Sequence, residues 1–212
     1  MRILANDGID KIAADELAAR GFEIDRGHYG KDELKAKIKD FDVLIVRSAT
    51  KVDQEIIDAA AQGDLRLIVR AGVGIDNIDA AYAQMRGIEV RNTPNASSDS
   101  VAELVLGHMF SLARFISIAN VTMRDGKWNK KEYEGVELAG KTLGIIGFGR
   151  IGRSLAEKAS ALGMDVMFHD ICVKNDEKFE YAEFDALIKN ADFISVHTPF
   201  TGEALIGETQ FR

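Results

Sequence analysis

The stretch from Thr142 to Gly152 constrains the fold of this chain more than any other. An apolar run ends at Ile146 and leads into glycines 147, 149 and 152, which have the spacing Gly-x-Gly-x-x-Gly. A helical pattern follows over residues 153–162, and Gly163 is placed to end that helix. A second apolar run, residues 166–168, ends in Asp170. A strand, a glycine turn, a helix and a second strand in this order predict a βαβ unit with parallel strands.

Each glycine of this motif has a physical task in such a unit. Gly147 allows a tight turn, Gly149 allows the backbone to approach a pyrophosphate, and Gly152 allows the helix to pack close to the strand. The helix N-terminus offers unpaired N–H groups to phosphates. Asp170 stands where a carboxylate can bind ribose hydroxyls and repel a 2′-phosphate. The pattern predicts a dinucleotide site that favours NAD over NADP; the alternative is a glycine turn in another α/β sheet, with Asp170 a solvated strand end.

Residues 1–94 show the same alternation of strand and helix, so we expect a first α/β domain there with a mainly parallel sheet. The expected strands are residues 2–6, 22–25, 43–46, 67–70 and 89–91. The expected helices are residues 10–19, 31–39, 54–61 and 78–85.

A turn-rich joint at residues 92–99 separates this domain from a second one, residues 95–212. The second domain opens with a long amphipathic helix, for which Ser100 and Glu103 have the spacing of a capping box, and which ends at Asp125-Gly126. A helix at residues 183–189 and a strand at residues 193–196 follow the glycine motif. Strands for only one half of a double Rossmann sheet can be counted, so the second domain is expected to be truncated.

Composition excludes several classes of function. The net charge of −7, without a basic stripe, argues against nucleic acid as a partner. No apolar run has the length of a membrane span, and the N-terminus has no secretory signal pattern. Cys172 is the one cysteine and has no metal-ligand spacing around it, so we expect no disulfide, no metal site and a cytoplasmic location.

Several further segments resemble the D-isomer-specific 2-hydroxyacid dehydrogenases, and within that family the D-3-phosphoglycerate dehydrogenases. The resemblance covers nearly the whole chain. It implies two domains with Rossmann- or flavodoxin-like parallel sheets, a substrate-binding lid followed by an NAD-binding domain. The segments that carry it are residues 44–52, 70–79, 92–95, 101–103, 125–128, 140–152 and 196–199.

The resemblance also implies a substrate site on the lid domain. Arg47 and Ser48 would bind the carboxylate or phosphate of a small 2-hydroxy acid, and the backbone of residues 72–74 would bind the carboxylate. Alternatively, Arg47 is a solvated charge and Gly72, Val73 and Gly74 form a plain turn. Val73 would also approach the nicotinamide. Asn95 would contact substrate or brace the hinge.

For the cofactor, the resemblance places Arg150 and Ile151 over the pyrophosphate. Thr198 and Pro199 would line the pocket for adenine and ribose. His197 belongs to the same motif and is counted with the cofactor site, and for this histidine a packed side chain is a stronger interpretation than any catalytic role. Lys130 and Lys131 would offer charge to a neighbouring subunit, but a solvated charge run is the better interpretation.

In the family, hydride moves between the nicotinamide and C2 of the acid, and the catalytic Arg, Glu and His lie downstream of Arg212. We therefore expect no catalytic residue in these 212 residues and no turnover by them alone. The resemblance favours 3-phosphoglycerate, in serine biosynthesis, as substrate. The alternatives are a glyoxylate/hydroxypyruvate reductase, a D-lactate dehydrogenase or a non-catalytic NADH-sensing corepressor. The amphipathic helix and the arm after it predict a homodimer; the alternative is that the helix packs only on the sheet of its own domain.

Overall fold

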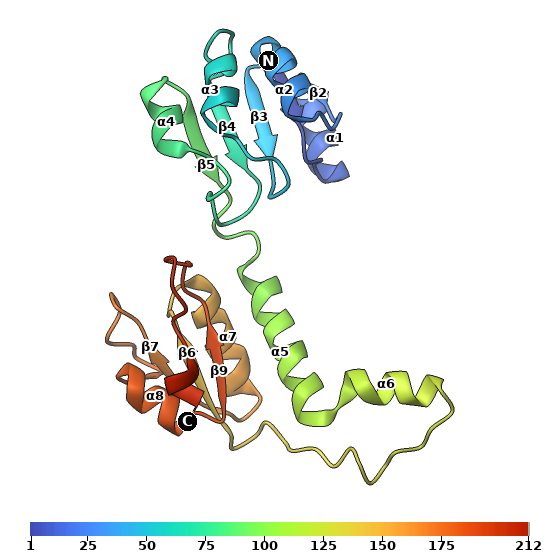
Figure 1. Ribbon diagram of the computed structural model, residues 1–212, viewed down its shortest axis with the longest axis vertical. Coiled ribbons are helices and arrows are strands. Elements are labelled where there is room, and N and C mark those ends of the chain that lie inside the picture. The colour runs from blue at the N-terminus through green and yellow to red at the C-terminus, as the bar shows by residue number, and fades with distance from the viewer. Residues whose placement is uncertain (212) are drawn as a thin grey trace. The chain divides into compact units, whose positions relative to one another are not determined.

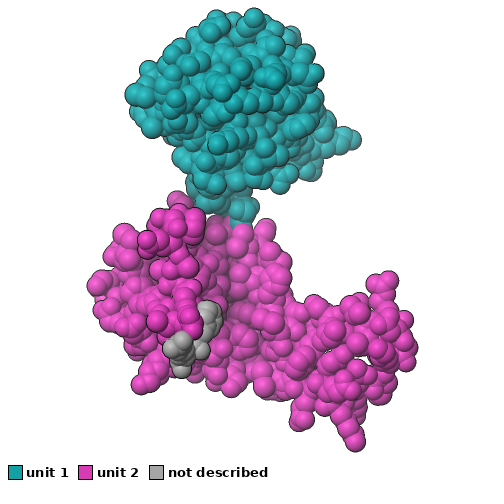
Figure 2. All heavy atoms as spheres, viewed as in Figure 1, with its two compact units in different colours: residues 1–97 teal, residues 98–212 magenta. Residues whose placement is uncertain are grey.

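The computed structural model describes residues 1–211 (Figure 1). The chain divides into two compact units, Met1–Ser97 and Ser98–Arg212, which Figure 2 shows in different colours. Each unit is an α/β structure with its own parallel sheet. The expected fold class, two Rossmann- or flavodoxin-like domains, is confirmed.

Unit 1 contains a five-stranded sheet in the order β2-β1-β3-β4-β5, in which every neighbouring pair is parallel. This is the flavodoxin-like order, which reverses direction between β1 and β3. The strands are β1 (Arg2–Ala5), β2 (Glu23–Asp25), β3 (Val43–Val46), β4 (Leu67–Arg70) and β5 (Glu89–Asn92). The helices are α1 (Lys11–Ala19), α2 (Lys31–Lys37), the 3-10 helix η1 (Ile38–Asp40), α3 (Gln54–Ala60) and α4 (Ala80–Met85).

Successive residues of a strand face opposite sides of a sheet, so β1 and β3 supply two separate cores. Leu4, Leu44 and Val46 join the core under α2, α3 and α4. Ile3 and Ile45 join a smaller core on the face covered by α1. Apolar residues at every position of β3, Val43–Val46, are therefore required.

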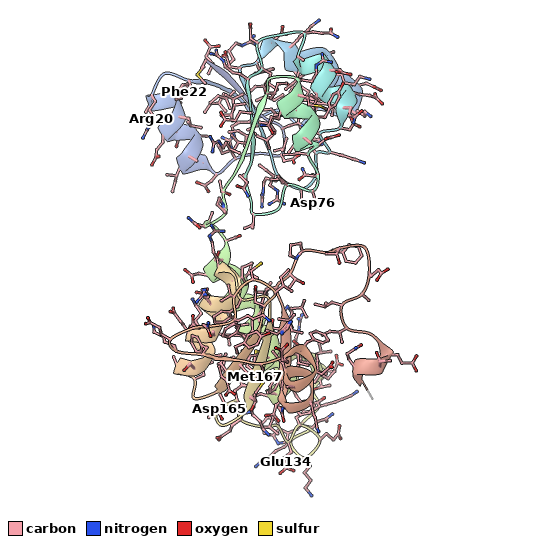
Figure 3. The ribbon with its side chains drawn as sticks, turned by 90° about the vertical axis from the view of Figure 1, so that its left-hand side faces the viewer. Arg20, Phe22, Asp76, Glu134, Asp165 and Met167 are labelled. Carbon is pink, nitrogen blue, oxygen red and sulfur yellow. The ribbon has the colours of Figure 1, made fainter. Side chains whose placement is uncertain are left out.

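Unit 2 contains a four-stranded parallel sheet in the order β8-β7-β6-β9. The strands are β6 (Thr142–Ile146), β7 (Asp165–His169), β8 (Glu180–Tyr181) and β9 (Phe193–Val196); Asp165 and Met167, labelled in Figure 3, mark β7. The strand order reverses at β6, because β7 and β8 are added on one side of β6 and β9 is added on the other. β8 was not predicted from the sequence, because two residues are too few to show a strand period.

Helices pack on both faces of this sheet. On one face, α5 (Ser98–Arg114) and α7 (Arg150–Ala161) enclose a core with β6 and β7. On the other face, α8 (Phe184–Asn190) packs directly over Gly144, where a Cβ would lie 2.6 Å from a methyl carbon of Leu187. The short 3-10 helix η2 (Glu208–Phe211) follows β9.

The prediction of one long helix after the joint was wrong. α5 ends at Arg114, and α6 (Ile116–Arg124) continues at an angle of 64°. Phe115 between them has the left-handed backbone, φ 55°, and its ring stacks on Tyr133. No glycine or proline stands at this break, and the helical spacing of apolar residues continues through it, so the sequence predicted a single helix.

The predicted capping box was also wrong. α5 begins at Ser98, which puts Ser100 inside its first turn, so Ser100 does not cap the helix. Asp99 accepts hydrogen bonds from Ser154 and Lys158 of α7 instead. Across residues 1–211, no single helix meets the length and hydropathy of a membrane span. α5 and α6 together do so by length and composition alone, as a bent pair.

Candidate functional site

The glycine loop, residues 147–152, follows the carboxyl end of β6, at the point between β6 and β9 where the strand order of unit 2 reverses. α/β sheets bind ligands at such switch points, outside the carboxyl ends of their strands. Gly147 has φ 93°, and a Cβ there would lie 2.8 Å from the carbonyl carbon and oxygen of His197. Only glycine fits this turn, because both the left-handed backbone and the adjacent end of β9 exclude a side chain.

The other two glycines differ in what surrounds them. A Cβ at Gly152 would clash with the carbonyl oxygen of Gly147, so α7 needs glycine here to pack against the turn. A Cβ at Gly149 would meet nothing within 4 Å. The backbone at Gly149 therefore has open space beside it, and its approach to a pyrophosphate stays a prediction.

α7 begins at Arg150, directly after Gly149. The Arg153 amide donates to the Gly149 carbonyl and is the first intrahelical donor of α7, so the amides of Arg150, Ile151 and Gly152 before it have no acceptor within the helix. These donors, with the positive end of the helix dipole, form an anion-binding terminus. Arg150 is exposed and Ile151 is half-buried.

Asp170 follows β7 and faces the glycine loop. One carboxylate oxygen accepts the Phe148 amide at 2.7 Å, and the other accepts the amides of Cys172 and Val173 at 2.8 and 3.0 Å. Burial, the largest single influence, raises the pKa of Asp170. These three amides and the nearby His169 outweigh burial and lower the pKa below its ordinary value. The carboxylate therefore stays charged, and it links the glycine loop to the turn that follows β7.

A pocket of about 830 Å³ opens beside the glycine loop, entirely within unit 2. Of the residues expected to bind cofactor, six line it: Gly147, Gly149, Asp170, His197, Thr198 and Pro199. Arg150, Ile151 and Gly152 are the first three residues of α7 beside it and are not among its lining residues. Val73 belongs to unit 1, so its approach to the nicotinamide stays a prediction.

The chemistry of the pocket suits a dinucleotide. Ile171, Phe184 and Leu205 are among its lining residues, and apolar side chains of this kind suit a flat aromatic base. The start of α7 suits a diphosphate, and the charged Asp170 carboxylate lines the same pocket and accepts the Phe148 amide of the glycine loop. His197 bonds Ser195 Oγ through Nε2 at 2.9 Å, and burial lowers its pKa, so it is a neutral packed side chain.

Unit 1 gathers the residues expected to bind substrate at the carboxyl ends of its own strands. Arg47 and Ser48 follow β3 and are exposed, and within residues 1–211 the Arg47 guanidinium has no ion-pair partner. Gly72, Val73 and Gly74 follow β4. The end of β5 braces this turn, because Asn92 donates to the Val73 carbonyl at 2.5 Å. Asn95 is exposed in the turn before α5, and its role stays a prediction.

Two polar residues at this edge, Asp7 and Asn77, were not predicted from the sequence to belong to the site. The Asp7 side chain is 3% exposed and accepts three hydrogen bonds from residues 47 and 50. Asn77 donates to the carbonyls of Arg47 and Thr50, both at 2.7 Å. The Asp7-Gly8 sequence is typical of an ordinary turn. The only sequence signal for a role in the site is that Asp7 comes directly after the predicted strand at residues 2–6.

Comparison with known proteins places this geometry in a family. The model of the D-isomer specific 2-hydroxyacid dehydrogenase NAD-binding domain matches residues 106–212. A hydroxypyruvate reductase of Thermotoga maritima is 48% identical over 94% of this chain and 65% of its own length. A D-3-phosphoglycerate dehydrogenase of Methanocaldococcus jannaschii is 42% identical over 99% of this chain and 41% of its own length.

Solved structures agree. A crystal structure from Thermus thermophilus has a TM-score of 0.87 at 32% identity and covers 95% of this chain and 66% of that one. An NAD-dependent formate dehydrogenase of Staphylococcus aureus in complex with NAD has a TM-score of 0.80 at 29% identity, with coverage of 95% and 66%. The chain thus spans from about two fifths to two thirds of the length of these relatives. It belongs to the D-isomer specific 2-hydroxyacid dehydrogenase family, close to D-3-phosphoglycerate dehydrogenases and hydroxypyruvate reductases, and its cofactor is NAD.

Proposed function

We propose that the protein is an NAD-dependent oxidoreductase that moves a hydride between the nicotinamide and a 2-hydroxy acid. The observation that carries the proposal is the glycine loop at the β6/β9 switch point, with the charged Asp170 opposite the start of α7. The α7 amides would hold the diphosphate, and Asp170 would bind the adenosine ribose. NAD, when bound, supplies the hydride acceptor.

We propose 3-phosphoglycerate as the substrate. The exposed Arg47, with Ser48 beside it and the backbone of residues 72–74 on the next loop, offers one cation and several backbone groups to an acid with two anionic ends. The Methanocaldococcus relative is named for this substrate, which also supports the choice. The Thermotoga relative favours hydroxypyruvate as the second candidate.

The catalytic arginine, glutamate and histidine of the family are proposed to lie downstream of residue 212. The chain itself would then bind NADH without ordinary turnover. Titration with NADH should increase the coenzyme fluorescence, whereas 3-phosphoglycerate with NAD should produce no NADH. Ordinary turnover by the verified 212-residue chain would contradict this assignment of the catalytic residues, and absence of NADH binding would contradict the oxidoreductase proposal.

The substrate is best tested on protein made from the complete reading frame. We expect kcat/KM for 3-phosphoglycerate oxidation to exceed that for unphosphorylated D-glycerate. Preference for the unphosphorylated acid, or for hydroxypyruvate reduction, would favour the second candidate. Binding of NADH without turnover of any 2-hydroxy acid would favour the corepressor-like alternative.

We also propose a homodimer in the cytoplasm. α5 and α6 expose a set of large apolar side chains, which soluble monomers rarely leave in a contiguous patch. The set consists of Leu104, Leu112, Ile116, Ile118, Val121 and Met123. A second copy would cover them.

A further inference from the structure

Asp7 places a buried carboxylate at the β1/β3 switch point of unit 1. One of its oxygens accepts the amides of Arg47 and Thr50, at 2.7 and 3.0 Å. The other accepts the Thr50 hydroxyl at 2.5 Å, and that hydroxyl in turn accepts from the Asn6 amide group at 2.9 Å. The carboxylate thus holds both ends of residues 47–50, called here the Arg47 loop.

Asn77 joins the Arg47 loop to the turn after β4. Its side chain donates to the carbonyls of Arg47 and Thr50, and its own carbonyl accepts the Val52 amide at 2.8 Å. Asn77 stands three residues after Gly74, and Asp76 between them is labelled in Figure 3. The two loops that would meet an anionic substrate are therefore linked by side-chain hydrogen bonds at both ends of the Arg47 loop.

We propose that Asp7 is a positioning residue for anion recognition, which acts through Thr50 and the Arg47 backbone and shares this work with Asn77. It holds the Arg47 guanidinium at one place relative to the backbone of residues 72–74, so that both meet one phosphorylated 2-hydroxy acid. This inference rests on the proposed function, in which Arg47 binds the substrate anion.

The type of side chain supports this role. The three groups that converge on Asp7 are all donors, and a carboxylate is the side chain that only accepts. Asparagine would turn an NH₂ group towards at least one of these donors. The Thr50 hydroxyl is equally specific, because it both donates to Asp7 and accepts from Asn6, which valine cannot do.

Ligand binding by the full 212-residue chain tests the proposal. The dissociation constants of 3-phosphoglycerate and D-glycerate are measured by NMR titration for wild type, Asp7→Asn, Thr50→Val, Thr50→Ser and Arg47→Gln. We expect wild type to favour the phosphorylated acid. Asp7→Asn and Thr50→Val should lower that preference at least fivefold, Thr50→Ser should restore it, and Arg47→Gln should abolish it.

Asp42→Asn is the matched control. Asp42 accepts hydrogen bonds from the Arg2 amide and from Arg66, and it precedes β3 at the opposite edge of the same sheet. Its loss costs the same charge but should leave the preference between ligands unchanged. A general loss of stability would weaken the binding of both acids alike, whereas misplacement of Arg47 changes their ratio.

Two results overturn the proposal in distinguishable ways. A normal ratio in Asp7→Asn and Thr50→Val, together with a lost ratio in Arg47→Gln, would refute the positioning role and leave the proposed function intact. An unchanged ratio in Arg47→Gln would refute both. If Asp7→Asn does not fold, the comparison of Thr50→Val with Thr50→Ser decides the question.

Discussion

Two aspartates do similar work at the carboxyl ends of the two sheets. Asp7 follows β1 and Asp170 follows β7, and each accepts three hydrogen bonds that tie two loops together. Burial raises the pKa of Asp7 most, but the Thr50 hydroxyl, the amides of Thr50 and Arg47, and His28 together lower it below its ordinary value. Both carboxylates therefore keep their charge at the sites where anionic ligands would bind.

Replacement of Asp170 by asparagine should weaken NADH binding at least tenfold. The variant loses the negative charge of the hydrogen bond from the Phe148 amide of the glycine loop, and a hydrogen bond to a charged group contributes about 1.5–3 kcal/mol. Titration by coenzyme fluorescence measures the effect. Asp165→Asn, at the exposed opposite end of β7 and labelled in Figure 3, should stay within about twofold of wild type. Equal affinities of Asp170→Asn and wild type would contradict the assignment.

His197 should make the folded chain less stable in mild acid. Burial lowers its pKa in the folded state below the ordinary value of about 6.5, so the unfolded chain binds the proton more readily. Stability from this residue is present above pH 6.5 and is lost as the pH falls towards the lowered pKa. Urea unfolding from pH 7.5 to 5.5 should therefore show a steeper loss for wild type than for His197→Gln. Parallel curves would refute this prediction.

At the scale of the secondary-structure elements, two glycines of the glycine loop should differ in role: Gly149 matters for NADH binding and Gly152 for stability. Gly149→Ala has room for its Cβ and ordinary φ, so the free energy of unfolding should hold or rise by up to about 1 kcal/mol while NADH affinity falls. Gly152→Ala forces α7 away from the Gly147 carbonyl and should cost about 1–3 kcal/mol. Urea unfolding and NADH titration of both variants provide the test, and a Gly149→Ala variant with full affinity would contradict it.

The elements predicted correctly from the sequence are those whose limits a local pattern of apolar residues defines. β3, β4 and β9 have the expected limits, because each is a short apolar run bounded by polar or turn residues. The glycine loop and Asp170 were also found, since each glycine has a separate steric reason. The break at Phe115 could not be predicted, because a stack on the distant Tyr133 accompanies it. The role of Asp7 depends on partners 40 residues away, which no local pattern shows.

At the scale of the whole molecule, the two units have separate hydrophobic cores and should respond separately to coenzyme. NADH at one hundred times its dissociation constant should stabilise unit 2 by about 2.7 kcal/mol. Hydrogen exchange should then slow at the core amides of β6 and β7 and remain unchanged at those of β3 and β4. Equal protection of both cores would show that the units unfold together.

The exposed apolar set on α5 and α6 should be covered by a second copy in solution. Leu112→Glu and Val121→Glu, at side chains 72% and 54% exposed, should together convert the dimer to a monomer in sedimentation velocity. Ile12→Glu, on α1 at 71% exposure, provides the control and should leave the sedimentation coefficient unchanged. A wild-type chain that sediments as a monomer would refute the dimer.

The left-handed backbone at Phe115 gives one residue control over the shape of the surface through which we propose that two copies pair. It sets the direction in which α6 leaves α5, and the apolar set spans both helices. A side chain pays about 1–3 kcal/mol to hold such a conformation. Substitution at this one position could therefore reorient one half of the contact surface against the other, and a related sequence could acquire a different quaternary symmetry without altering any residue of the surface itself.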